Sequence, residues 1–278
     1  MLKFRVASGL MMGAALLAAL FFLPAEGALF VLLFICALAL REFYQLLDEA
    51  RIPNFNRFGV WGGCILMAVT WYEYRHGIES ASHDPELLTL FLIAASIFVR
   101  QFGPTRSERP LETMAGTLMG LIYIAFMLNF FVRLLMAWGP MGSRILVFYT
   151  ILVVKCTDMG AYFTGRAIGR RRIFPRLSPN KTWEGFVGGL AAALAASFAV
   201  WFLAGGCLGP LCFTALDAFF LGLLLALTGV VGDLFESLLK RAAGVKDSGA
   251  MIRGMGGVLD VIDSLLPAAP VVYFYARF

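Results

Sequence analysis

The chain has 278 residues, of which 60% are hydrophobic and 15% charged, and its formal net charge is +5. A soluble domain is nearer half apolar and a quarter charged, so this composition excludes an ordinary soluble protein and indicates one embedded in lipid. The length allows one or two domains, and no linker rich in proline or serine divides the chain. We expect an all-α, polytopic transmembrane bundle whose N-terminal helices (1–140) and C-terminal region (141–278) form one integral domain.

Nine apolar segments predict about nine membrane-crossing helices, several of them near the ~20 residues that a bilayer requires. They cover 7–23, 28–47, 58–74, 87–101, 113–135, 144–164, 185–205, 214–235 and 257–276. The first segment follows Lys3 and Arg5 as a signal peptide would, but no convincing A-x-A cleavage site comes after it. We therefore expect it to remain as an uncleaved span.

The basic residues divide unequally between the two sides of this predicted bundle. One side carries 18 of the 23 lysines and arginines: Lys3, Arg5, Arg41, Arg51, Arg57, Arg100, Arg106, Arg109, Arg166, Arg170, Arg171, Arg172, Arg176, Lys181, Lys240, Arg241, Lys246 and Arg253. The positive-inside rule places that side, and the N-terminus with it, in the cytoplasm. Topology alone explains most of the bias, but six cations within 165–181 favour a phosphate or lipid-headgroup surface over nucleic acid.

Cysteine and histidine offer little chemistry. The five cysteines, at positions 36, 64, 156, 207 and 212, form no C-x-x-C pair. We expect them to be small apolar side chains that fill space. The two histidines, His76 and His83, share a polar loop, which excludes a histidine-based zinc site within the membrane core.

The first polar cluster lies late in an apolar segment. Lys155 precedes Asp158 by three residues, and the sequence continues as Met-Gly160-Ala-Tyr-Phe-Thr-Gly165-Arg. Ionisable groups at such depth usually face a protein interior or an aqueous cavity. The alternative is an internal Lys155–Asp158 pair that only stabilises the bundle. The two glycines would allow another helix to approach closely.

The second cluster begins a helix. It reads Ser178-Pro-Asn180-Lys181-Thr-Trp-Glu184-Gly. We expect Ser178 or Asn180 to cap the helix, with Glu184 in its first turn. Unpaired N–H groups at a helix start attract anions, and Lys181 would stand beside them. The alternative is helix-start chemistry with no ligand.

The third cluster marks the end of an apolar segment. Asp233, Glu236, Ser237 and Lys240 follow i, i+3, i+4, i+7 spacing, so a helix would present them on one face, and Arg241 flanks them. Two acids followed by two bases suit a metal ion next to a phosphate.

The fourth cluster is rich in glycine and acids. It contains Lys246-Asp247-Ser-Gly and then Arg253-Gly-Met-Gly-Gly-Val-Leu-Asp260-Val-Ile-Asp263. Asp260 and Asp263 share a helix face inside an apolar run, where two unpaired carboxylates would repel each other. A bound divalent cation would relieve this repulsion. With Asp233 they form a set of oxygen ligands suited to Mg²⁺.

Several familiar devices are missing from the sequence. It contains no P-loop, no G-x-G-x-x-G after a strand, no H-E-x-x-H and no plausible Ser-His-Asp set. The D-G-x-x-A-R motif of CDP-alcohol phosphotransferases is also missing.

Together these motifs resemble the phosphatidate cytidylyltransferase (CDP-diacylglycerol synthase) family. The resemblance rests on Asp158-x-Gly-Ala-Tyr-Phe-x-Gly-Arg, Ser178-Pro-x-Lys-Thr-Trp-Glu-Gly, Gly232-Asp-Leu-x-Glu-Ser-x-x-Lys-Arg-x4-Lys-Asp-x-Gly and Gly256-Gly-x-x-Asp-x-x-Asp263. It runs from about residue 150 to the end, and the first half matches only in hydropathy and length. The family usually has Pro or Gly where Arg253 stands, His where Met255 stands and Arg where Val261 stands. We hypothesise that Arg253 restores the missing positive charge.

The resemblance implies an activity and a site. A nucleotidyltransferase of this family moves a cytidylyl group from CTP to phosphatidate in phospholipid biosynthesis, giving CDP-diacylglycerol and pyrophosphate. The resemblance implies that Mg²⁺ is held by Asp233, Asp260 and Asp263, and it leaves open a second, monovalent cation. It assigns phosphate binding to Lys181, Lys240, Arg241, Lys246 and Arg253, and orienting roles to Asp158, Glu236, Ser237 and Asp247. Among these, we expect the catalytic residues to be Asp233, Asp260, Lys181 and Lys240.

The expected partners are CTP, phosphatidate and membrane lipid, without nucleic acid, and a homodimer is left open. We expect a bacterial plasma (inner) membrane protein whose active site faces the cytoplasm. Alternatives are a related CTP-dependent enzyme, such as a polyprenol kinase or an archaeal-type CDP-lipid synthase, and, from other classes, a transporter or a scaffold. A transporter would carry its buried charges at the midplane, whereas here they gather at one face.

Overall fold

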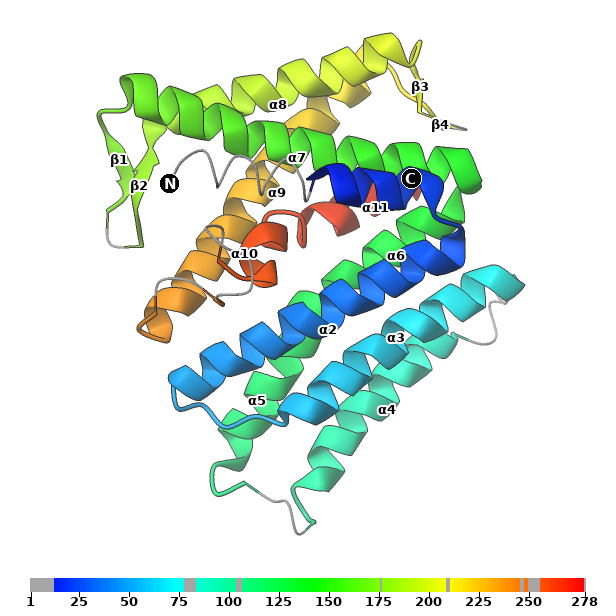
Figure 1. The fold of residues 1–278 in the computed structure, drawn as a ribbon, viewed down its shortest axis with the longest axis vertical. Helices are drawn as coiled ribbons and strands as arrows, with labels where there is room; N and C mark the ends of the chain where they lie inside the picture. The colour runs from blue at the N-terminus through cyan, green and yellow to red at the C-terminus, as the bar shows by residue number, and fades with distance from the viewer. Residues whose placement is uncertain are drawn as a thin grey trace. The chain divides into compact units, whose positions relative to one another are not determined.

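The computed structural model describes residues 13–77, 84–103, 107–175, 177–208, 211–245, 248–249 and 256–277. These residues are mostly helical, which confirms the all-α prediction (Figure 1). The chain divides into two compact units. The first comprises Met1–Ala137 and Ala242–Val261, and the second comprises Trp138–Arg241 and Ile262–Phe278.

The first unit contains a short helix over Gly13–Phe22 and the successive elements α2 (Ala25–Glu49), α3 (Asn56–His76), α4 (Pro85–Arg100), α5 (Pro110–Gly120), the π-helical η1 (Leu121–Phe126) and α6 (Met127–Ala137). Figure 1 shows α2, α3 and α4 side by side. The buried Tyr44 of α2 donates a hydrogen bond to the Thr117 carbonyl at 3.0 Å. Gly59 and Gly120 leave room for its ring, since an added Cβ would lie 2.0 and 2.7 Å from the tyrosine oxygen. These contacts fix α2 within the unit.

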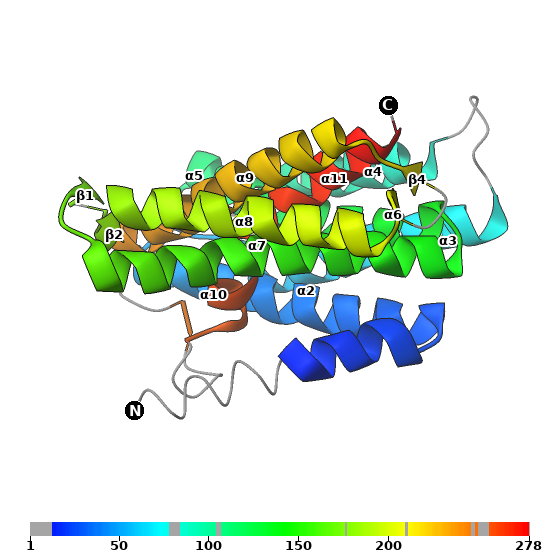
Figure 2. The same ribbon diagram turned by 90° about the horizontal axis from the view of Figure 1, so that it is seen from above.

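The second unit contains α7 (Pro140–Ile168), α8 (Trp183–Leu203), α9 (Ala215–Ala242) and α11 (Ala268–Arg277). Figures 1 and 2 show α7 and α8 running side by side along their length. A Cβ added to Gly160 would lie 2.4 Å from the Ala192 Cβ, and one added to Gly185 would lie 2.8 Å from the Ala161 carbonyl oxygen. This confirms that Gly160 permits close approach of a second helix, because no larger residue fits there.

Five helical stretches are long and apolar enough to cross a membrane: Ala25–Glu49, Pro110–Ala137, Pro140–Ile168, Trp183–Leu203 and Ala215–Ala242. They indicate an integral membrane protein. Helices also occur at the first, third and fourth predicted spans, but in the described part of the chain these do not reach the same length and hydropathy. The count of nine spans therefore stays a prediction, as does the cytoplasmic N-terminus.

The last predicted span, 257–276, is wrong as a single helix. The structure divides it into α10 (Val258–Ile262) and α11, with a turn over 263–267 between them. Pro267 explains the break, because proline has no N–H and its ring clashes with the carbonyl four residues earlier, which belongs to Asp263. A Cβ added to Gly232 of α9 would lie 2.3 Å from that carbonyl oxygen. The broken helix and the glycine together bring α9 against the turn.

The segment before α8 is a hairpin. β1 (Arg172–Phe174) pairs antiparallel with β2 (Ser178–Thr182). The expected cap at Ser178 or Asn180 is therefore wrong, because both lie within β2. Thr182 caps α8, and its hydroxyl accepts a hydrogen bond from the Gly185 N–H at 3.1 Å. Glu184 does stand in the first turn, as predicted.

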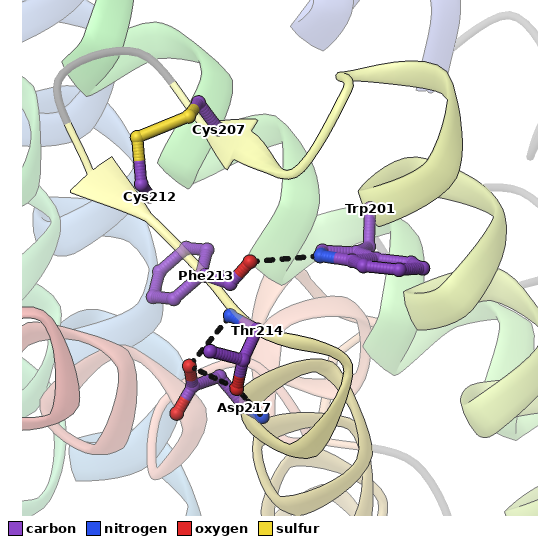
Figure 3. The surroundings of a disulfide bond; sticks show 6 residues. All are labelled: Trp201, Cys207, Cys212, Phe213, Thr214 and Asp217. Carbon is purple, nitrogen blue, oxygen red and sulfur yellow. Dashed lines mark hydrogen bonds between the residues drawn. A yellow bond between two sulfur atoms is a disulfide. The ribbon is translucent and has the colours of Figure 1, made fainter.

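A second hairpin, β3 (Cys207–Leu208) with β4 (Leu211–Cys212), connects α8 to α9 and contains a disulfide between Cys207 and Cys212 (Figure 3). The prediction that these two cysteines are apolar filler is wrong. Their sequence signal is the Gly-Pro pair between them, which favours a turn that brings the two ends together. Trp201 of α8 supports the hairpin by donating its indole N–H to the Phe213 carbonyl at 2.8 Å.

Candidate active site

Three carboxylates gather in the second unit. Asp233 and Glu236 stand one turn apart on α9, and Asp263 begins the turn after α10. One ligand oxygen from each lies within 4.8 Å of the others, and Glu236 and Asp263 are only 1% and 6% exposed. Carboxylate oxygens are the ligands that a hard divalent cation prefers, and such an ion would offset the repulsion between acids held this close. This donor set therefore fits the Mg²⁺ that the sequence implies.

Two predicted phosphate-binding lysines contact this group. The Lys181 ammonium lies 2.7 Å from the Asp233 carboxylate, and the Lys240 ammonium lies 2.5 Å from the Glu236 carboxylate. Lys181 arrives on β2, immediately before the cap of α8, whereas Lys240 stands one turn after Glu236 on α9. The structure thus brings the second and third sequence clusters together and places two cations beside the acids.

Arg241 and Ser237 lie on α9 close to these residues. The Arg241 guanidinium donates a hydrogen bond to the Leu177 carbonyl at 3.4 Å, so it borders the hairpin that carries Lys181. Arg241 is exposed and Ser237 half-buried. The cationic end of α9 therefore lies beside the β1–β2 hairpin.

Asp158 belongs to a second polar contact in the same unit. The Lys155 ammonium lies 3.3 Å from the Asp158 carboxylate and 3.2 Å from the Ser264 hydroxyl, which itself donates to Asp158 at 3.2 Å. The internal Lys155–Asp158 pair considered from the sequence thus exists, and it extends to the residue next to Asp263. Sequence reasoning missed Ser264, whose only signal was its place after Asp263.

Asp260 lies in the first unit and holds the glycine-rich segment. Its Oδ2 accepts hydrogen bonds from the Ser248 N–H at 3.1 Å, the Ser248 hydroxyl at 2.7 Å and the Gly257 N–H at 2.7 Å. Gly256 adopts φ +93°, and an added Cβ would lie 2.4 Å from the same oxygen. The carboxylate therefore has a fixed position, and its role as a metal ligand stays a prediction.

Sequence reasoning also missed Glu42 of α2. This side chain is 2% exposed, and its two oxygens accept hydrogen bonds from the Val258 N–H at 3.0 Å and the Leu259 N–H at 2.8 Å. The available signal was an acid within an apolar segment, which is costly unless it has partners. Its partners stand 216 and 217 residues away in the sequence, where no local pattern reveals them.

The predicted site residues Lys246, Asp247 and Arg253 lie outside the described residues, as do Met255 and His83. Val261, the third departure from the family pattern, is half-buried on α10.

The comparison with known proteins covers nearly the whole chain. The sequence pattern described as the cytidylyltransferase family matches residues 3–278. Phosphatidate cytidylyltransferase of Brucella suis biovar 1 (strain 1330) is 35% identical over 248 residues, covering 87% of this chain and 83% of the relative. The Bacillus subtilis (strain 168) protein of the same name is 30% identical over 278 residues, covering 98% and 97%. An uncharacterized protein of Escherichia coli (strain K12), YnbB, is 32% identical over 246 residues, covering 87% and 76%. The chain belongs to the cytidylyltransferase family.

Proposed function

We propose that this protein transfers a cytidylyl group from CTP to phosphatidate, giving CDP-diacylglycerol and pyrophosphate. The family and the names of the relatives support a nucleotidyltransferase of this kind. The observation that carries the proposal is the contact of two lysines, Lys181 and Lys240, with a cluster of three carboxylates at the end of α9. Acids for a metal and cations for phosphates are what a reaction between two anions requires.

Asp233, Glu236 and Asp263 would hold Mg²⁺, and Asp260 is the further ligand proposed from the sequence. A bound Mg²⁺ supplies neutralising charge for the phosphates of the nucleotide. Lys181 and Lys240 would bind phosphate oxygens, while their carboxylate partners keep the ammonium groups in place before substrate arrives. Arg241, Lys246 and Arg253 would extend this cationic surface. A second, monovalent cation stays a prediction.

The chemistry needs positioning more than proton transfer. A phosphate oxygen of phosphatidate forms a bond to the α-phosphorus of CTP, and the bond from that phosphorus to the bridging oxygen breaks, releasing pyrophosphate. The attacking phosphate is already anionic near neutral pH, because its second pKa is about 6. No strong general base is required, and the lysines act by orienting the anions and stabilising their charge.

The site is proposed to face the cytoplasm of a bacterial inner membrane. The basic loops favour this orientation, and the disulfide adds independent support, because disulfides persist outside the reducing cytoplasm. The 21 residues of α8 would extend about 30 Å at ~1.5 Å per residue. Figure 2 shows β1 and β2 at one end of α8 and β4 at the other. Lys181 and the disulfide Cys207–Cys212 would thus lie on opposite membrane faces, with the phosphate-binding end inside.

The direct test follows radiolabel from CTP into lipid. Purified protein in phosphatidate-containing vesicles should transfer label from [α-³²P]CTP to lipid and none from [γ-³²P]CTP. Transfer of the γ-label to a polyprenol would instead identify a kinase, and transfer of the α-label to an archaeal-type ether lipid but not to phosphatidate would identify the related synthase. Absence of transfer from either label would favour a transporter or scaffold. Sedimentation of the purified protein would test the homodimer.

A further inference from the structure

We propose that Glu42, on α2, is a positioning residue for the reaction: it fixes the backbone of 257–259 and thereby the Asp260 carboxylate. This inference rests on the proposed function, in which Asp260 takes part. It concerns only residues of the first unit, to which Glu42, Ser248, Gly257 and Asp260 all belong.

Both oxygens of the Glu42 carboxylate accept hydrogen bonds from this backbone. It is 2% exposed, and each of its oxygens accepts one N–H, from Val258 at 3.0 Å and from Leu259 at 2.8 Å. A carboxylate removed from water is costly unless its oxygens are hydrogen-bonded, and bonds from N–H groups to a charged acceptor are stronger than neutral ones. The acid therefore holds two consecutive peptide groups in one orientation.

Two glycines of the fourth sequence cluster, Gly249 and Gly257, lie close to the Glu42 carboxylate. A Cβ added to Gly257 would lie 2.3 Å from Glu42 Oε2, and one added to Gly249 would lie 2.8 Å from Oε1. Only residues without a side chain let the carboxylate reach the backbone here. The glycines thus accommodate an acid of the protein itself, which gives them a role that the sequence pattern did not reveal.

Gly257 links Glu42 to Asp260. The Glu42 carboxylate occupies the space that a Cβ on Gly257 would need, and the Gly257 N–H donates to Asp260 Oδ2 at 2.7 Å. Asp260 itself follows Leu259 directly in the chain. A shift of the backbone at 257–259 would therefore displace Asp260 and weaken the hydrogen bonds that fix its carboxylate.

A purely structural role is the competing explanation, and Glu86 offers a matched control. Glu86 is 4% exposed and lies in the same unit, where it pairs with Arg133 at 2.6 Å and accepts from Thr70 at 2.9 Å. It is a buried acid of similar cost, and among the residues that the structure describes its side-chain partners are Thr70 and Arg133, far in sequence from the 248–260 segment. Loss of Glu86 should lower thermal stability without altering Asp260.

The first readout is amide hydrogen exchange of the intact, metal-free protein in detergent. Glu42→Ala should accelerate exchange in peptides covering 257–260 by about tenfold or more, because two amides lose their acceptor. Glu42→Gln, which keeps the shape and one acceptor oxygen, should have a smaller effect. Glu86→Gln should leave exchange in 257–260 unchanged. Unchanged exchange in both Glu42 variants would overturn the proposal.

The second readout is cytidylyl transfer per folded molecule as a function of Mg²⁺ concentration. We expect Glu42→Ala to lower kcat and raise the half-saturating Mg²⁺ concentration, each by roughly 10–100-fold, as loss of a supporting residue does. Glu42→Gln should recover part of the loss, and Glu86→Gln should show the wild-type Mg²⁺ dependence. Equal effects in Glu42→Gln and Glu86→Gln would overturn the positioning role. Failure of the wild type to transfer the label would refute the proposed function instead, while exchange would still decide the Glu42 contact.

Discussion

The Lys240 ammonium lies 2.5 Å from the Glu236 carboxylate, one turn away on α9, and the two side chains are only 14% and 1% exposed. Removing one partner of such a buried pair strongly destabilises the folded protein, because the other charge stays buried without it. Lys240→Ala should therefore lower the free energy of unfolding of the metal-free protein by roughly 3–5 kcal/mol, measured by thermal or denaturant unfolding.

The double variant Lys240→Leu with Glu236→Leu separates stability from function. It should regain most of the lost stability, because neither member of the pair is left as a buried charge without the other, yet it should not transfer the label. A double variant that is fully active would exclude Lys240 and Glu236 from the active site.

The three aspartates among the four acids proposed or predicted as metal ligands should be essential. Asp233→Asn, Asp260→Asn and Asp263→Asn should each lower cytidylyl transfer at least about 100-fold without loss of folded protein, because a neutral amide binds Mg²⁺ poorly. Asp217→Asn is the matched control, since Asp217 lies on α9 but pairs with Thr214 and Tyr275. Near-normal turnover of Asp233→Asn and Asp260→Asn would refute the metal assignment.

Gly232 and Gly229 offer a test of the turn that carries Asp263. An alanine Cβ at Gly232 would lie 2.3 Å from the Asp263 carbonyl oxygen, whereas one at Gly229 would meet nothing closer than 3.4 Å. Gly232→Ala should thus reduce both thermal stability and turnover, with a stability loss of about 1–3 kcal/mol from overpacking. Gly229→Ala should be tolerated. Similar melting temperatures for the two variants would show that the close approach is unimportant.

The disulfide should be accessible from outside the cytoplasm. In intact spheroplasts, a membrane-impermeant maleimide should label Cys207 and Cys212 only after reduction, and reduction should cost about 2 kcal/mol of stability for so short a loop. Turnover should persist, since the hairpin lies at the far end of α8 from Lys181 (Figure 2). Labelling confined to inside-out vesicles would show that the protein has the opposite orientation.

Arg253 tests one departure from the family pattern. If this cation replaces the arginine that the family usually has at the position of Val261, Arg253→Ala should raise the KM for CTP and lower turnover, whereas Arg253→Lys should retain part of the activity. Steady-state kinetics in phosphatidate vesicles would measure both. Unchanged kinetics of Arg253→Ala would sink the hypothesis.

Local sequence determined most of the helices and the part of the site that lies on α9. Hydropathy placed the apolar helices, and i, i+3, i+7 spacing placed Asp233, Glu236 and Lys240 on one face of α9, because both patterns depend only on the periodicity of a helix. The same apolar content concealed the break before Pro267, where a missing N–H and a steric clash outweigh hydropathy. The close packing at Gly160 was also predictable, since small residues in apolar helices favour contact.

What only the tertiary structure decided are the contacts between residues far apart in the chain. Lys181 contacts Asp233 although all of α8 lies between them in the sequence. Ser264 contacts Lys155 and Asp158, and Cys207 pairs with Cys212 through the geometry of a hairpin. Glu42, silent in the sequence as one acid among apolar residues, holds the backbone before Asp260. Such partners are chosen by packing and by the need of each buried polar group for a hydrogen bond, and no local pattern records that choice.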